Sequence, residues 1–257
     1  RGVATVTLVA KQITAQHYGK PSDHAYFVGC STGGREAMMM SQRYPDYFNG
    51  IVAGAPAMRR SFSNLGLRHA TAALNAIAPL NPEGHPDTRA ALSDADRRLV
   101  VDGVLEECDA LDGRRDGLIF ATQKCAFDPG VLACKDGKQN HCLSRAKVEA
   151  VRTVMRGPRT SSGRQVYPGY YYDTGIANTE GLAGVLVGPV IPEGRPVGVN
   201  FDIDAAWAEA INARSMVGDT HAWTNLSSFR AHAGRLIFLH GVSDPWFSAR
   251  DTVEYYE

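Results

Sequence analysis

The sequence lacks the features that mark membrane-spanning and nucleic-acid-binding proteins. Its 257 residues include 27 basic and 27 acidic side chains, so the formal net charge is zero. This balance gives no electrostatic attraction to nucleic acid or to an anionic membrane surface. All apolar runs are far shorter than the roughly 20 residues that a bilayer-spanning helix needs. We therefore expect a globular protein without nucleic-acid or membrane partners, and we predict no particular oligomeric state.

The chain also has no initiator methionine and no secretory signal sequence at its start. Its first residues, RGVATVTLVAKQ, instead suggest the start of an amphipathic helix. We take this as a first indication that segments of the natural protein are missing.

Cysteine is scarce and unevenly placed. Four of the five cysteines, Cys108, Cys125, Cys134 and Cys142, lie in one stretch rich in Asp, Gly and Lys. No C-x-x-C pair occurs, which disfavours zinc. Two local disulfides in an exported protein would stabilise a segment that buries little apolar surface. Buried free thiols in a cytosolic protein are the alternative, and Cys30 is left over in either case.

The order of the predicted elements indicates an α/β core. Residues 3–18 predict a helix and residues 25–29 a strand. A second helix begins at Thr32 and is stopped by Pro45. Residues 50–57 then form a short, fully apolar strand of the kind buried in parallel sheets. Strand, helix and strand in this order predict a βαβ unit.

The middle of the chain interrupts this core. From residue 58 to residue 223 the sequence is rich in loops, with predicted helices at 93–108 and 202–215. An apolar strand, RLIFLHG, and the start of a helix, SARDTVEYYE, follow. We therefore predict core segments at 1–57 and 224–257 and an insertion at 58–223.

The stretch GCSTGG joins the first predicted strand to its helix. Gly29, Ser31 and Gly33 match G-x-S-x-G, in which small residues let the strand approach the helix and the serine projects from the turn. The backbone N–H of Thr32 would then face a developing oxyanion. A serine that only caps the helix is the alternative. It does not explain two glycines in the first helical turn, where each costs about 1 kcal/mol relative to alanine.

Two segments resemble the tannase and feruloyl esterase family. They are GCSTGGREAMMMSQRYPDYFNGIVAGAPA and HGVSDPWFSARDTVEYY. The resemblance implies an α/β-hydrolase core with an inserted lid domain, and a serine esterase of feruloyl, galloyl or terephthalate monoester substrates. It implies Ser31 as the nucleophile and Asp244 as the acid. It also implies a downstream histidine, next to a cysteine that is disulfide-bonded to Cys30.

The catalytic base is the residue that this sequence does not supply. In α/β hydrolases the histidine follows the acid in the chain. All eight histidines precede Asp244, and they are His17, His24, His69, His85, His141, His221, His232 and His240. His240 lies at the same strand end as the acid, and we interpret it as structural. We therefore expect the base outside this chain, both ends of the hydrolase core to be truncated, and these 257 residues alone to be essentially inactive. An Asp before Pro in an ordinary turn is the alternative for Asp244.

The stretch CDALDGRRDGLI predicts a calcium loop in the insertion. Its carboxylates, Asp109, Asp112 and Asp116, are three or four residues apart, as suits a hard cation with 6–8 oxygen ligands. The register is not that of an EF-hand, and a solvated Asp-Gly loop is the alternative. The family resemblance implies a structural Ca²⁺ site that also uses the main-chain carbonyls of Arg114 and Leu118.

The resemblance also selects one disulfide pattern and a place for the substrate. Four cysteines allow three pairings, and only the resemblance implies Cys108–Cys125 with Cys134–Cys142. The lid should cover the active site with aromatic and cationic side chains. The candidates are Tyr167, Tyr170, Tyr171, Tyr172, Trp223, Phe229 and Arg164. For each tyrosine, simple packing within the lid is the alternative.

Three classes of function follow. The first is a secreted or periplasmic serine esterase of a small aromatic ester. The second is a catalytically inactive α/β-hydrolase relative that acts as a binding or scaffold protein. The third is a calcium-binding extracellular module in which the serine turn is incidental.

Overall fold

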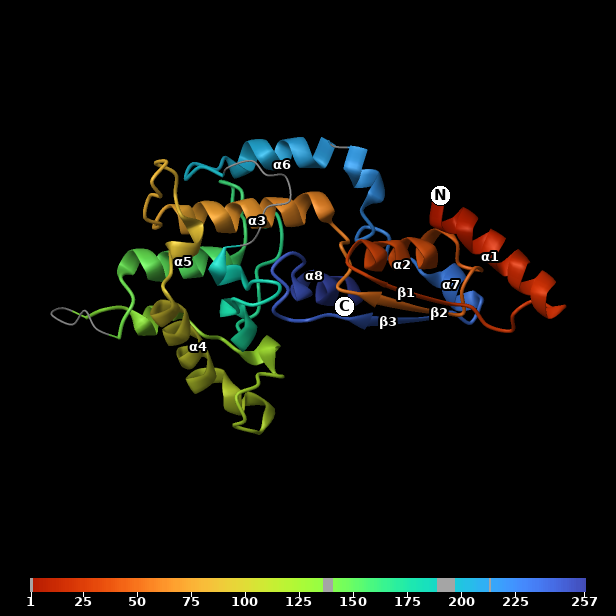
Figure 1. The fold of residues 1–257 in the computed structure, drawn as a ribbon, viewed down its shortest axis with the longest axis horizontal. Helices are drawn as coiled ribbons and strands as arrows, with labels where there is room; N and C mark the ends of the chain where they lie inside the picture. Colours follow the sequence, from red (N-terminus) through yellow and green to blue (C-terminus); the bar gives the residue numbers. More distant parts are fainter. Residues whose placement is uncertain (1, 136–140, 189–196, 213) are drawn as a thin grey trace. The chain divides into compact units, whose positions relative to one another are not determined.

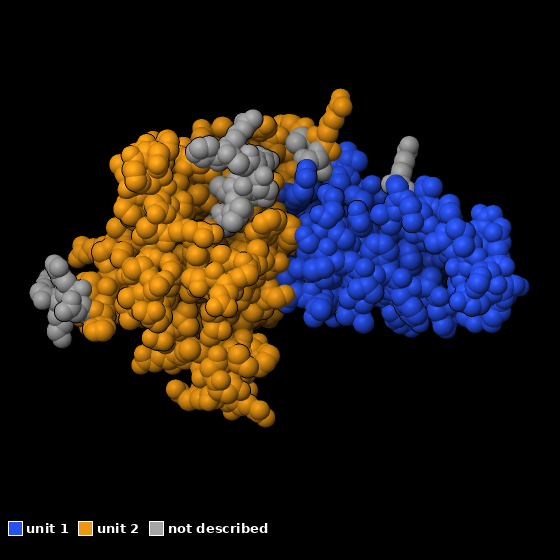
Figure 2. Space-filling view, in the orientation of Figure 1, with its two compact units in different colours: residues 1–60, 217–240, 252–257 blue, residues 61–216, 241–251 orange. Residues whose placement is uncertain are grey.

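A computed structural model describes residues 2–135, 141–188, 197–212 and 214–257. They form two compact units (Figure 2). Unit 1 comprises 1–60, 217–240 and 252–257, and unit 2 comprises 61–216 and 241–251. The unit boundaries after residues 60 and 216 lie three and seven residues from the predicted boundaries of the insertion, after residues 57 and 223. Residues 241–251, which we predicted to belong to the core, group with unit 2 instead.

Unit 1 contains a three-stranded parallel sheet (Figure 1). Strands β1 (Tyr26–Cys30), β2 (Gly50–Gly54) and β3 (Arg235–Leu239) pair in that order. The chain passes from β1 through helix α2 (Thr32–Arg43) to β2, so the predicted βαβ unit is confirmed. The apolar segment at 50–57 pairs as a strand only as far as Gly54.

One face of the sheet is covered and carries the core of unit 1. Helix α2 packs on β1 and β2, and its Ala37 and Met38 are fully buried together with Ala53 of β2. Helices α1 (Gly2–Tyr18) and α7 (Ser227–Ala231) contribute Ala4 and Phe229 to the same cluster. The core therefore holds the strand end and the helix start that flank Ser31.

The opposite face of the sheet is apolar and exposed. Because side chains alternate along a strand, Tyr26 and Val28 of β1 and Ile237 and Leu239 of β3 point to this face. Their exposed fractions are 68%, 74%, 60% and 70%. Parallel sheets are ordinarily covered on both faces. We call these four residues the open sheet face.

Unit 2 is helical and loop-rich. Its helices are α3 (Arg60–Asn75), α4 (Asp94–Cys108), α5 (Arg145–Arg156) and α6 (Ile203–Asn212). Arg60 and part of α8 (Ala249–Tyr256) belong to unit 1. The main core of unit 2 joins α3, α4 and α5. The helix predicted at 93–108 is confirmed as α4, and the one predicted at 202–215 is confirmed as α6 as far as Asn212. In the described ranges no helix has the length and apolar character to cross a membrane.

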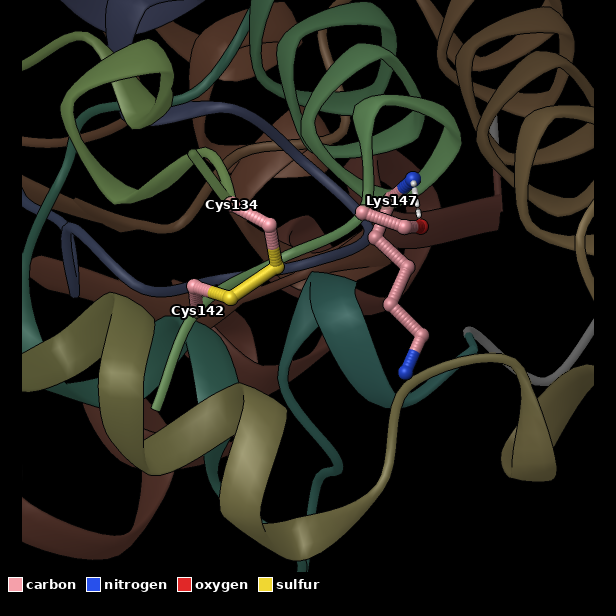
Figure 3. Close-up of a disulfide and its surroundings, with 4 residues drawn as sticks. Cys134, Cys142 and Lys147 are labelled. Atoms are coloured by element: carbon pink, nitrogen blue, oxygen red, sulfur yellow. Dashed lines mark hydrogen bonds between the residues drawn. A yellow bond between two sulfur atoms is a disulfide. The ribbon is translucent and has the colours of Figure 1, made fainter. Parts of the chain in front are cut away.

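Helices α3 and α5 were not predicted, and the loop-rich reading of their segments was wrong. Helix α5 carries an ordinary start signal, because the N–H of Lys147 donates to Ser144 Oγ over 3.3 Å (Figure 3). In α3 the sequence contains Gly66, a residue that disfavours helix, and this hides the helical pattern. A Cβ atom there would lie 3.1 Å from the Tyr167 ring, so the glycine serves close packing.

Candidate active site

Ser31 occupies a strained turn between β1 and α2. Its φ is 59° and its ψ is −117°, a backbone conformation that residues other than glycine rarely adopt. Such strain is characteristic of functional sites and of the serine in a strand-to-helix nucleophile elbow. The Ser31 side chain makes no capping hydrogen bond to α2, so the helix-cap alternative does not account for this residue.

The backbone of Ser31 is held from the end of β2. Its N–H donates to the carbonyl oxygen of Gly54 over 3.0 Å. Its own carbonyl oxygen accepts from the N–H groups of Arg35, at 3.1 Å, and Ala57, at 3.2 Å. These bonds tie the turn to two neighbouring elements, which offsets part of the cost of its conformation.

Two of the three glycines at this turn are required by close contact. A Cβ atom on Gly29 would lie 2.3 Å from the carbonyl oxygen of Gly33, and one on Gly34 would lie 2.4 Å from that of Gly54. A Cβ atom on Gly33 would meet nothing within 4 Å. The close approach of strand and helix therefore depends on Gly29 and Gly34.

This difference predicts opposite effects of two adjacent substitutions. Gly34→Ala forces a methyl group against backbone, and we expect it to lower the free energy of unfolding by about 1–3 kcal/mol. Gly33→Ala adds a better helix former in open space and should raise that free energy by up to about 1 kcal/mol. Urea unfolding of both variants measures the difference. Equal effects would contradict the packing described here.

The start of α2 supplies a hydrogen-bond donor beside Ser31. Thr32 is the first residue of the helix, so its N–H has no acceptor within the helix. Among the described residues, this N–H donates to no other backbone acceptor. The first turn of α2 contains no acidic side chain, and the positive end of the helix dipole is left to act on an anion.

No base accompanies Ser31 in the described part of the chain, where nothing hydrogen-bonds to its hydroxyl group. His240 Nδ1 lies 2.8 Å from Thr252 Oγ1, in agreement with a structural role. Burial and the nearby charge of Arg59 lower the pKa of His221 to about 4. Neither histidine hydrogen-bonds to the Ser31 hydroxyl group.

Asp244 lies in the loop between β3 and α8, within unit 2. Its Oδ1 accepts hydrogen bonds from the N–H groups of Trp246, at 2.8 Å, and Phe247, at 3.0 Å. The N–H of Asp244 donates to the carbonyl oxygen of Gly241 over 3.1 Å. The loop therefore fixes the orientation of this carboxylate. Ser31 belongs to unit 1 and Asp244 to unit 2.

Most of the aromatic side chains named as substrate contacts are buried. Tyr167, Tyr170, Tyr171 and Phe229 have exposed fractions of 1–7%. The Arg164 guanidinium lies over the Trp207 ring, 5.0 Å from its centroid. For the three tyrosines and Phe229 the observed burial favours packing over contact with a substrate. Trp223, 52% exposed, is stacked by Arg43 at 5.1 Å.

The aspartate loop curls around its own carboxylates. Asp109 Oδ1 accepts from the N–H of Gly117 at 3.1 Å, and Asp112 Oδ2 accepts from that of Phe120 at 3.1 Å. Gly113 and Gly117 have φ values of 95° and 80°, which glycine permits. The donor set is all oxygen and suits calcium. The side chains of Asp109, Asp112 and Asp116 do not have one oxygen each within 4.8 Å of the others, so ion binding requires these oxygens to move closer together.

Two disulfides stabilise unit 2, with the pairing that the family resemblance implied. Cys108–Cys125 links the end of α4 to the loop that follows the aspartates. Cys134–Cys142 precedes α5 (Figure 3). Cys30 is a free, exposed thiol directly before Ser31.

Comparisons with known proteins agree with this geometry. A family model described as tannase and feruloyl esterase matches residues 1–189. Mono(2-hydroxyethyl) terephthalate hydrolase of Piscinibacter sakaiensis is 33% identical, over 98% of this chain and 51% of its own length. A probable feruloyl esterase B-2 of Aspergillus terreus is 29% identical, over 100% and 48%. The crystal structure of feruloyl esterase B from Aspergillus oryzae superposes with a TM-score of 0.77 at 25% identity, over 100% of this chain and 51% of that one. The chain thus spans about half the length of the relatives it matches.

Proposed function

The chain belongs to the tannase and feruloyl esterase family, and from this premise we propose that it carries the nucleophile and the acid of a serine carboxylic ester hydrolase. The main support for this proposal is the backbone conformation of Ser31. Its positive φ of 59° occurs in G-x-S-x-G, between a parallel strand and a helix start. This is the arrangement that exposes a nucleophilic serine beside an oxyanion-binding N–H.

In the proposed reaction, Ser31 Oγ attacks the ester carbonyl carbon while its proton passes to a histidine. The Thr32 N–H donates to the carbonyl oxygen as that oxygen gains negative charge. The histidine returns the proton to the leaving alcohol, and an acyl–Ser31 intermediate forms. Water gives a proton to the histidine and attacks the acyl carbon, the bond to Ser31 Oγ breaks, Oγ takes the proton back, and the carboxylic acid is released. Asp244 accepts a hydrogen bond from the histidine and stabilises its charged form.

We propose an aromatic carboxylic ester as the substrate, on the basis of the relatives' names. The test is a panel of methyl ferulate, methyl gallate and mono(2-hydroxyethyl) terephthalate, with ethyl butyrate as an aliphatic control. The full gene product containing these residues should hydrolyse at least one aromatic ester faster than the control. Binding of these esters without turnover would favour the inactive-relative alternative.

We place the histidine, and a cysteine that pairs with Cys30, in polypeptide outside these 257 residues. The proposal is supported by the Ser31 hydroxyl group, which has no basic partner among the described residues. It is also supported by the open sheet face, which further segments of the same core would cover. Non-reducing peptide mapping of the full gene product tests it. A bond from Cys30 to a cysteine within residues 1–257 would overturn it.

We further propose that the aspartate loop binds a structural Ca²⁺ ion. The side chains of Asp109, Asp112 and Asp116 and the carbonyls of Arg114 and Leu118 would hold it. The ion would offset two of the three negative charges on this loop, next to the Cys108–Cys125 disulfide. Its role would be to stabilise unit 2 and not to activate water.

Calcium is accordingly expected to raise the melting temperature. At a concentration 100-fold above Kd, the ion stabilises the folded state by about 2.7 kcal/mol, which corresponds to about 5–10 °C for a domain of this size. Asp112→Asn should abolish most of this shift, whereas Glu107→Gln, an exposed acid on α4 outside the loop, should retain it. Scanning calorimetry with EDTA and with Ca²⁺ measures both. A parent protein with no calcium-dependent shift would exclude the site.

We place the protein outside the cytoplasm, as a secreted or periplasmic enzyme, because it carries two disulfides and cytosolic proteins rarely keep such bonds. Cell fractionation with an antibody against the protein tests this location. Recovery in the cytosol alone would contradict it.

A further inference from the structure

Residues 167–173 of unit 2 contact the Asp244 loop on both sides of the acid. Ser243 Oγ donates a hydrogen bond to Asp173 Oδ1. The Tyr170 hydroxyl group donates to the carbonyl oxygen of Pro245 over 2.9 Å. The residues immediately before and after Asp244 are therefore bound to one segment.

The same segment also binds the start of α8. The N–H of Ser248 donates to the Tyr167 hydroxyl oxygen over 3.0 Å, and Ser248 Oγ donates to the carbonyl oxygen of Gly169 over 2.5 Å. The Arg250 guanidinium lies over the Tyr171 ring, 4.4 Å from its centroid. The loop thus has partners in this segment along most of its length.

From these contacts we propose that Tyr170 and Asp173 are positioning residues that hold the Asp244 carboxylate in its working orientation. The inference rests on the proposed hydrolase function, in which Asp244 orients the histidine. In this proposal the buried tyrosines of unit 2 contribute to catalysis by holding the Asp244 loop and not by contacting the substrate.

The hydrogen bond from Tyr170 to Pro245 is well placed to restrict the movement of the Asp244 loop. Tyr170 is 3% exposed, and a hydrogen bond in such a low-dielectric site is strong. The carbonyl oxygen of Pro245 can only accept, so the tyrosine must donate. Burial, and to a lesser degree the charge of Asp244, raise the pKa of Tyr170, which keeps the hydroxyl group protonated.

The Asp173 contact depends on a glycine. Asp173 is 4% exposed, and its Oδ1 also accepts from the N–H of Gly175 over 2.6 Å. A Cβ atom on Gly175 would lie 2.1 Å from Ser243 Oγ, so the absence of a side chain there lets Ser243 reach the carboxylate. Burial raises the pKa of Asp173, and the two hydrogen bonds oppose this effect. Asp173 Oδ1 is therefore fixed by two donors.

The segment offers a matched pair of variants for the test. Tyr170→Phe removes one hydroxyl group and with it the bond to Pro245. Tyr172→Phe removes the same group two residues away, where the ring packs on Phe127 with centroids 5.1 Å apart. Among the described residues, no hydrogen bond of the Tyr172 hydroxyl group is recorded. The control therefore changes the same atom without touching the acid loop.

In the full gene product, we expect Tyr170→Phe to lower kcat on the preferred aromatic ester by about 10- to 100-fold, because a small misplacement of a catalytic group has an effect of this size. KM should change little. A displaced Asp244 stabilises the protonated histidine less, so the histidine pKa falls. Since the neutral histidine is the base, the acid limb of the kcat/KM profile should move to lower pH. Tyr172→Phe should show neither change.

A second measurement is independent of activity. In Tyr170→Phe, hydrogen exchange should quicken at the amides of Trp246 and Phe247, which donate to Asp244 Oδ1. If no ester is hydrolysed but exchange changes as expected, the proposed function fails while the positioning contact stands. If the parent hydrolyses esters and Tyr170→Phe matches Tyr172→Phe in kcat, pH profile and exchange, the positioning inference is wrong.

Discussion

Replacing Ser31 with alanine should lower kcat on an aromatic ester by about 10⁴- to 10⁶-fold in the full gene product, because covalent catalysis loses its nucleophile. The remaining rate would come from substrate binding and from the Thr32 N–H. KM should change much less than kcat, since the serine hydroxyl is not proposed to bind the ground state. Steady-state kinetics with the best substrate of the ester panel measures this.

The control for this prediction is Ser22→Ala. Ser22 is an exposed serine in the loop before β1 of unit 1. Replacing it removes the same hydroxyl group as Ser31→Ala but leaves the turn at Ser31 unchanged. Circular dichroism should show both variants folded. A Ser31→Ala enzyme with a rate near that of the parent would remove Ser31 from the mechanism.

Asp244→Asn should have the second largest effect, a fall in kcat of about 10⁴-fold. The asparagine carbonyl oxygen can still accept from the N–H groups of Trp246 and Phe247, so the loop should keep its shape. The charge that stabilises the protonated histidine is lost, and the amide can favour the wrong histidine tautomer.

A neutral control is available in the same unit. Asp102 is an exposed aspartate on α4. Asp102→Asn also removes one negative charge, at a position far from Asp244 in the sequence. It should retain parental kinetics. Full activity in Asp244→Asn would mean that this residue only shapes an ordinary Asp-Pro turn.

The parts of the fold that sequence predicted well are those set by neighbouring residues. The turn at Ser31 follows from three glycines, an apolar strand and a helix start within a few positions. The structure refines this, since Gly34 is the buried glycine that meets Gly54 while Gly33 faces open space. The contact partner of Gly34 lies on another strand, so the sequence of the turn alone could not distinguish the two glycines.

Unit 2 was predicted less well, because its structure depends on packing between residues far apart in the sequence. Helix α5 had a recognisable cap at Ser144. The glycine at position 66 of α3 is explained only by its close contact with the Tyr167 ring. The disulfide pairing likewise depended on the family resemblance, since spacing alone allowed three patterns.

The hydrogen bonds that hold the Asp244 loop were not predicted at all. Asp173 and Ser243 are 70 residues apart, and Tyr170 and Pro245 are 75 residues apart. Nothing in YPGYYYD indicates a partner at that distance. The flat aromatic rings suggested contact with a substrate, but three of the four tyrosines are buried.

Covalent labelling tests most directly whether Ser31 is the nucleophile of an esterase. The full gene product should be incubated with a 4-nitrophenyl phosphonate, digested and analysed by mass spectrometry. We expect a single phosphonate on Ser31, with release of one equivalent of nitrophenol and loss of ester hydrolysis in proportion. An enzyme that hydrolyses the aromatic esters but carries the label on another residue, or loses activity without a label on Ser31, would contradict it.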